Sequence, residues 1–97
     1  MIVVHKTDAF INWANGLRDE DAKAKIAARL DRLAMGNRGD VKSVGGGVSE
    51  MRIDHGPGYR VYFTHRGKAV VILLCGGDKR TQAKDIKTAQ KMVNELG

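Results

Sequence analysis

Two groups of cations in this sequence are placed where they would hold a phosphate. Arg60 lies early in an alternating stretch, Tyr59 to His65, and a long cation on an inner strand is a poor choice unless it meets an anion. The second group is the basic pair of Gly76-Gly77-Asp78-Lys79-Arg80, which separates the most apolar segment from a predicted helix. Glycines permit close approach of the backbone, and a helix start offers free N–H groups and a positive dipole end. Together these features predict an anion-binding site.

The glycine clusters Gly45-Gly46-Gly47, Gly56-Pro57-Gly58 and Gly76-Gly77 match no nucleotide-binding loop. The chain has no Gly-x4-Gly-Lys-Ser/Thr sequence and no Gly-x-Gly-x-x-Gly turn, so no mononucleotide or dinucleotide cofactor is expected. The three histidines are scattered without ligand spacing and the lone Cys75 lies in an apolar run, so no metal site is expected either. His55 stays a candidate catalytic residue, because it adjoins the turn that leads to Arg60 and titrates near neutrality.

Two alternating stretches predict a polar sheet face. If Met51 and Ile53 face a core, the other side of the sheet carries the following residues: Glu50, Arg52, Asp54, Arg60, Tyr62 and Thr64. Cross-strand neighbours lie about 5 Å apart, so these side chains would form one patch. We expect Glu50, Asp54 and Thr64 to lie on an ordinary solvent-exposed face and Arg60 to have a function.

The periodicity of the chain predicts the elements that position these residues. A short strand at 2–6 is followed by a helix capped by Thr7 and a second helix capped by Asp19, which ends at Gly36. Residues 37–47 are expected to form a loop, followed by strands at 48–55, 59–65 and 69–75 and a helix capped by Thr81. The prediction is a single α+β domain over 1–97, in the order β-α-α-β-β-β-α. Its small antiparallel sheet packs on an N-terminal helical hairpin, and a C-terminal helix follows.

Composition indicates the class of partner and the compartment. Seventeen Lys and Arg against eleven Asp and Glu give a net charge of +6, which favours nucleic acid or an acidic protein as partner; solubilising charge is the alternative. The N-terminus lacks a signal-peptide pattern, and the longest apolar run, 69–75, is far shorter than the ~18 residues of a membrane span. A cytoplasmic protein without a membrane partner is expected.

Two segments resemble a known family. "EMRIDHGPGYRVYF" and "ILLCGGDKRTQAKDIKTA" are similar to the HigB-like toxins, or addiction-module killer proteins, of the RelE/ParE superfamily. The resemblance implies a RelE-like fold and a type II toxin–antitoxin toxin, neutralised by a cognate helix-turn-helix antitoxin. RelE-type members cut mRNA on the ribosome without a metal, whereas ParE-type members poison DNA gyrase.

The resemblance also implies roles for individual residues. Arg60 matches the arginine that contacts the scissile phosphate in RelE-like nucleases, and Lys79 and Arg80 match a basic pair that serves the same phosphate. The sequence departs from the family where the lysines of the preceding strand are replaced by the pattern of Glu50, Arg52 and Asp54. A C-terminal tyrosine of the prototype is replaced by Ile86.

Metal-free RNA cleavage explains these residue types. It needs a base for the 2′-hydroxyl, cations around the phosphorane and an acid for the leaving 5′-oxygen. We expect Arg60 and Arg80 to stabilise the phosphorane with help from Arg52, and Glu50 or His55 to act as base. The expected RNA contacts are Lys79, Lys84, Tyr62, Gln82 and Gly77. The favoured function is thus a ribosome-dependent mRNA endoribonuclease without cofactor; a gyrase poison and a non-catalytic basic binding module remain alternatives.

Overall fold

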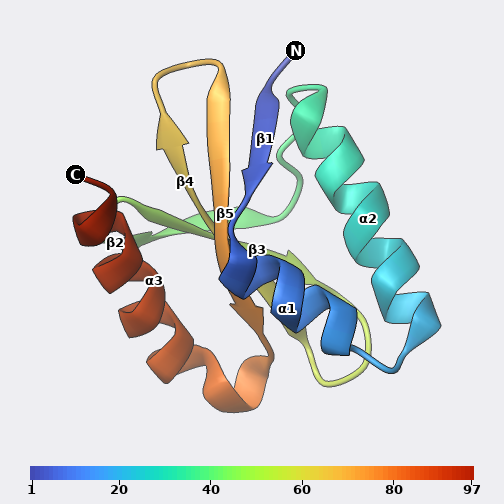
Figure 1. Cartoon of the computed structure of the whole chain (residues 1–97). Helices are drawn as coiled ribbons and strands as arrows, with labels where there is room; N and C mark the ends of the chain where they lie inside the picture. Colours follow the sequence, from blue (N-terminus) through green and yellow to red (C-terminus); the bar gives the residue numbers. More distant parts are fainter.

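A five-stranded sheet with helices on both faces forms the protein in the computed structural model, which describes all residues, 1–97 (Figure 1). In chain order the elements are β1 (Val3–Lys6), α1 (Asp8–Gly16), α2 (Glu20–Ala34), β2 (Val41–Gly45), β3 (Val48–Ile53), β4 (Tyr59–Arg66), β5 (Val70–Gly77), a 3₁₀ turn (Lys79–Thr81) and α3 (Gln82–Leu96). The predicted α+β class is confirmed. None of the helices is long and apolar enough to cross a membrane.

The sheet has the order β1-β5-β4-β3-β2, so β4 is its central strand. β2 to β5 are antiparallel neighbours, but β1 pairs with β5 in parallel. The prediction of a purely antiparallel sheet was therefore wrong. α1 and α2 carry the chain from β1, at one edge of the sheet, to β2 at the other edge. The connection between β1 and β5 therefore contains a crossover, which parallel neighbours require.

The predicted loop at 37–47 was also wrong, because it contains β2. This edge strand pairs with β3 but shifts register between Ser43 and Gly45, which breaks the alternation on which the prediction relied. Lys42, Ser43 and Gly45 are exposed, so no apolar pattern marks the strand.

The starts of α1 and α2 confirm the predicted caps. Thr7 Oγ1 accepts a hydrogen bond from the Phe10 amide at 3.2 Å, and Asp19 Oδ1 accepts one from the Ala22 amide at 3.1 Å. The Thr7 hydroxyl also lies 2.8 Å from the carbonyl oxygen of Leu73, which ties the start of α1 to β5.

The two sheet faces carry separate cores. α1 and α2 cover one face, where ten buried residues pack together: Phe10, Ile26, Leu30, Leu33, Met51, Ile53, Val61, Phe63, Val71 and Leu73. α3 covers the other face over five more: Val48, Tyr62, Leu74, Cys75 and Ala89 (Figure 1). The expected solvent-exposed sheet face is thus wrong for Glu50 and Thr64, which are 0% and 5% exposed. α3 has an apolar stripe that must be buried, and that face is where it packs.

The two glycines that end β5 serve packing. A Cβ at Gly76 would overlap the ring of Trp13 in α1, and a Cβ at Gly77 would overlap the Asp85 carboxylate and approach Thr81 Oγ1 to 2.9 Å. Both helices therefore approach the end of β5 more closely than any side chain there would permit.

Candidate functional site

A hollow of about 320 Å³ opens beside β3 and β4. We call it the Arg60 hollow; its lining residues are Asp40, Arg52, Ile53, Asp54, Gly58 and Arg60. Arg52 and Arg60 are direct cross-strand partners, so their side chains leave the sheet on the same face about 5 Å apart. Two guanidinium groups therefore share one short stretch of sheet, as the alternating pattern predicted.

Arg60 is the more buried of the two cations. Its side chain is only 12% exposed, and one terminal nitrogen, Nη1, donates to the carbonyl oxygen of Gly58. Its Nε lies 3.8 Å from Glu50 Oε2, which is an ion pair but too long for a hydrogen bond, and Nε has no hydrogen-bond acceptor in the protein. Buried polar groups normally have hydrogen-bond partners. The Arg60 guanidinium is held in place, but one of its N–H donors lacks an acceptor.

Glu50 lies behind Arg60 and is fully buried. Its Oε2 accepts hydrogen bonds from the Tyr62 hydroxyl at 3.1 Å and from the Gln82 amide at 2.9 Å. Its Oε1 has no hydrogen-bond donor, and the nearest cation is Lys42 Nζ at 3.9 Å. Glu50 therefore joins three strands, β2 to β4, to the first turn of α3.

Tyr62 supports this arrangement from within the protein. It is fully buried, and burial together with the Glu50 charge raises the pKa of its hydroxyl well above its usual value. The hydroxyl thus remains a neutral donor to the carboxylate. Tyr62 and Gln82, both expected RNA contacts, point their polar groups at Glu50.

Arg52 faces an anion of its own. Asp40 Oδ1 accepts from Arg52 Nη2 at 2.9 Å and from its Nε at 3.3 Å. This contact holds the pKa of the Asp40 carboxyl below, and that of the Arg52 guanidinium above, their usual values. Arg52 remains 45% exposed, so its cation still meets solvent at the rim of the Arg60 hollow.

The turn after β5 contains its own anion. Asp78 Oδ1 accepts from the Arg80 amide at 2.8 Å, and Asp78 Oδ2 lies 3.0 Å from Arg80 Nη2. The pair lowers the pKa of Asp78 and raises that of Arg80, whose side chain is 81% exposed. The prediction that Thr81 caps the last helix was wrong, because its hydroxyl makes no cap bond and donates to Asp85 instead. Of the N–H groups expected to hold phosphate at this helix start, the Arg80 amide donates to Asp78 instead.

The remaining expected residues fall in three places. Lys79 is exposed, and its Cβ lies beside Gly58, whose carbonyl oxygen accepts from Arg60 Nη1. Lys84 is exposed on α3. His55 Nε2 lies 2.9 Å from Asp19 Oδ2 and does not line the Arg60 hollow.

The structure therefore unites part of the expected set and separates the rest. Arg52 and Arg60 line the Arg60 hollow, and Glu50, bonded to Tyr62 and Gln82, lies next to Arg60. Gly77 is buried beneath α3, so the close approach that it permits is made by Asp85. Sequence analysis missed Asp40 and Lys42, because both lie in or beside the unrecognised strand β2. The chain contains no group of three His, Cys, Asp or Glu side chains able to hold a metal ion.

Comparison with known proteins places this arrangement in a family. The sequence profile described as "Phage derived protein Gp49-like (DUF891)" matches residues 15–94. A Haemophilus influenzae protein carrying only the name "Uncharacterized protein" is 53% identical over 96 residues, which cover 99% of this chain and 97% of that protein. Gp49-like proteins are toxins of toxin–antitoxin systems and are related to RelE and ParE.

Proposed function

We propose, from the premise that this chain belongs to the Gp49-like family of toxins, that it cuts messenger RNA on the ribosome and so arrests translation. The observation that carries the proposal is the Arg60 guanidinium, which is nearly buried, fixed by Gly58 and Glu50, and paired across the strands with Arg52. A phosphodiester oxygen seated in the Arg60 hollow would accept a hydrogen bond from Arg60 Nε, which has no acceptor in the protein.

The chemistry follows from this placement. The oxygen of an adjacent 2′-hydroxyl attacks phosphorus, the bond to the 5′-oxygen breaks, and a 2′,3′-cyclic phosphate and a 5′-hydroxyl result. The 2′-proton leaves to a base and the 5′-oxygen takes up a proton, so charge is conserved. Negative charge grows on the phosphorane oxygens between these events, and preorganised cations stabilise it most effectively where water is scarce.

The structure favours different roles for three residues from those the sequence indicated. Glu50 is fully buried, so we assign it the positioning of Arg60 rather than contact with RNA. Neither His55 nor Arg80 lines the Arg60 hollow, whereas Arg60 and Arg52 do. We therefore assign Arg60 and Arg52 to the phosphate and Lys79 to guiding the strand beside Gly58.

The class of activity is tested by inducing the chain in cells that lack its partner protein. We expect protein synthesis to stop first, with fragmented message, and to continue normally after induction of Arg60→Ala. Arrest of DNA replication with double-strand breaks and intact message would instead indicate a gyrase poison, and growth without any defect would indicate a non-catalytic binding module. Either result would overturn the proposal.

The family implies an antitoxin as partner of this protein. We propose that it is a helix-turn-helix protein, that the Arg60 hollow receives mRNA bound to the ribosome, and that the protein works in the cytoplasm without a cofactor. The favourable charge for RNA is the net +6 of the chain.

A further inference from the structure

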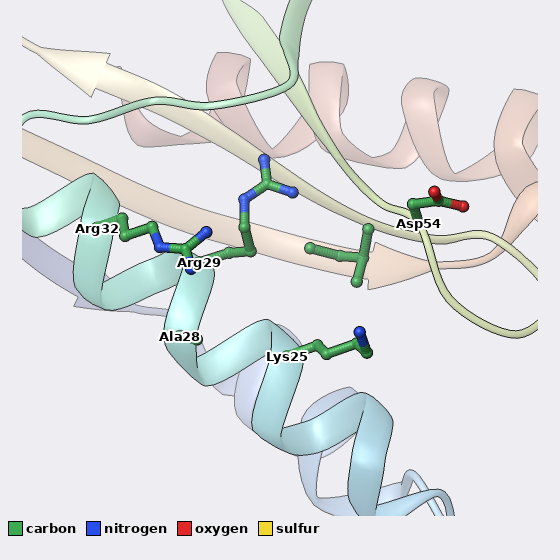
Figure 2. Close-up of a pocket in the computed structure, with 6 residues that line it drawn as sticks. Lys25, Ala28, Arg29, Arg32 and Asp54 are labelled. Carbon is green, nitrogen blue, oxygen red and sulfur yellow. The ribbon is translucent and has the colours of Figure 1, made fainter.

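A second hollow, of about 240 Å³, lies between α2 and the end of β3 (Figure 2). We call it the α2 groove; its lining residues are Lys25, Ala28, Arg29, Arg32, Ile53 and Asp54. Its three cations recur at intervals of four and three residues, so they project from one face of the helix. Successive cations are about one helical turn, or about 6 Å, apart along the helix axis. Ile53 and Asp54 also line the Arg60 hollow, so the two hollows adjoin at the end of β3.

The cations of the α2 groove form no close ion pair within the protein. No carboxylate lies within 4 Å of a charged nitrogen of Lys25, Arg29 or Arg32, whereas Lys23 on the same helix pairs with Glu20 at 3.7 Å. Arg29 is fixed, because its Nη1 donates to the Arg52 carbonyl oxygen at 2.7 Å. Like charges three and four residues apart destabilise a helix. The groove therefore carries an electrostatic cost that a bound anion would remove.

The rest of the lining indicates what kind of anion fits. Ala28, Ile53 and Asp54 complete the lining of the groove. Figure 2 shows Asp54 at one end of it, with its carboxylate directed away from the three cations. A phosphate backbone gains nothing from the aliphatic surface of Ala28 and Ile53. A protein segment, in contrast, combines carboxylates with apolar side chains and so matches both the cations and the aliphatic surface.

We propose that the α2 groove docks an acidic segment of a partner protein, with carboxylates one helical turn apart that meet Lys25, Arg29 and Arg32. A partner seated there reaches the Arg60 hollow across Asp54 and covers it, while making its main charge contacts on α2. The identification of this partner as the neutralising antitoxin rests on the proposed function. The docking of an acidic segment in the α2 groove does not depend on it.

The test uses the full chain labelled with ¹⁵N, a fluorescent oligoglutamate peptide, and a single-stranded RNA oligonucleotide of equal total charge. We expect the peptide to shift the amide resonances of α2 around Lys25 to Arg32. The double variant Lys25→Glu/Arg32→Glu should lose at least about ten-fold in peptide affinity, the weight of two lost charge contacts. The side chains of both residues are exposed and form no ion pair, so the variant should fold, which its NMR spectrum will show.

The matched control is Lys87→Glu/Lys91→Glu, which makes the same change in net charge on the exposed side of α3. It should lose no more than about two-fold in affinity. Equal losses in the two double variants would overturn the proposal, since binding would then follow net charge alone. Stronger binding of the RNA than of the peptide at α2 would overturn it in favour of a nucleic-acid groove. The assay contains no ribosome and no cleavage step, so a failed nuclease proposal leaves its result interpretable.

Discussion

Arg60 combines burial with an unsatisfied donor, whereas most buried polar groups have a hydrogen-bond partner. Its Nε finds no acceptor although Glu50 lies 3.8 Å away. A guanidinium confined in this way loses hydration without regaining all of its hydrogen bonds, and that costs stability. A protein retains such a loss of stability where its function requires the residue. A phosphate oxygen would supply the acceptor that Arg60 Nε lacks.

The substitution Glu50→Gln tests whether Glu50 positions Arg60 for cleavage or only stabilises the fold. The change leaves the shape of the side chain and removes the charge nearest Arg60. We expect unfolding to become easier by about 1–3 kcal/mol, because Arg60 loses its carboxylate. RNA binding should not weaken, since the Arg60 hollow becomes more positive, but cleavage should slow. Urea denaturation, RNA binding and single-turnover cleavage are measured on the same variant.

Glu95→Gln is the control, because Glu95 is exposed on α3 and makes no ion pair. It should change all three readouts little. If Glu50→Gln cleaves as fast as the unchanged protein, Glu50 does not position Arg60.

Cys75 should be chemically inert in the folded protein. Burial, with a contribution from Asp85, raises the pKa of its thiol to about 11, and the thiolate is the reactive form. At pH 8 we expect slow reaction with a thiol reagent in buffer and rapid reaction in concentrated urea, followed by absorbance. Fast modification of the native chain would show that α3 does not cover Cys75.

At the scale of elements, the end of β5 shows what the sequence can and cannot predict. Gly76 and Gly77 were correctly recognised as sites of close approach, but the approaching groups are Trp13 and Asp85 of this chain. Glycine shows that something lies close without showing whether it is a ligand or a helix. The same limit applies to Glu50, because alternation assigns it to a sheet face but not to what covers that face.

The contact between Gly76 and α1 is testable by adding one methyl group. Gly76→Ala should lower the free energy of unfolding by about 1–3 kcal/mol, because the Trp13 ring must move to admit a Cβ. Trp13 is the chain's single tryptophan, so its fluorescence follows the transition directly. Gly16→Ala is the control: a Cβ there meets nothing within 4 Å. Equal stability of the two variants would show that α1 does not pack on β5 as described.

α3 is the element that we expect to open most readily. It contributes one buried residue, Ala89, and holds the site through Gln82 bonded to Glu50. Amide hydrogen exchange should be faster in α3 than in β4 and β5. If α3 exchanges as slowly as the central strands, it is a fixed part of the core.

For the whole molecule, the sequence predicted the architecture more fully than the site. Periodicity identified three helices and four of five strands, since burial of an apolar face leaves a repeat in the sequence. The site depends on which neighbours neutralise which cations. Arg80 and Arg60 look alike in sequence, yet Asp78 pairs closely with the exposed Arg80, while Glu50 lies only loosely against the buried Arg60.

The acid stability of the molecule follows from three carboxylates. Asp19, Asp40 and Asp78 have lowered pKa values in the folded protein: for Asp19 the largest cause is the Ala22 amide, for Asp40 the Arg52 guanidinium, and for Asp78 the Arg80 guanidinium. A lowered folded-state pKa contributes stability above the unfolded value of 3.8, and this contribution is lost as pH falls through the folded value. Urea denaturation should therefore show a nearly constant midpoint in mildly acidic buffer and a falling one below about pH 4.

Asp19→Ala should reduce this fall, because it removes one of the three groups. It should also lower stability at neutral pH by removing the cap of α2 and the partner of His55. An unchanged acid transition in Asp19→Ala would assign the effect to other groups.

The most direct measurement is the rate at which purified protein cuts ribosome-bound message, compared between Arg60→Ala and Arg66→Ala. Both arginines lie on β4, but Arg66 is exposed at its end and lines no part of the Arg60 hollow. We predict that Arg60→Ala slows cleavage by about 10²–10³-fold, the usual effect of removing one preorganised charge, and that Arg66→Ala cuts at nearly the normal rate. Cleavage by Arg60→Ala as fast as by the unchanged protein would contradict the placement of the scissile phosphate against Arg60.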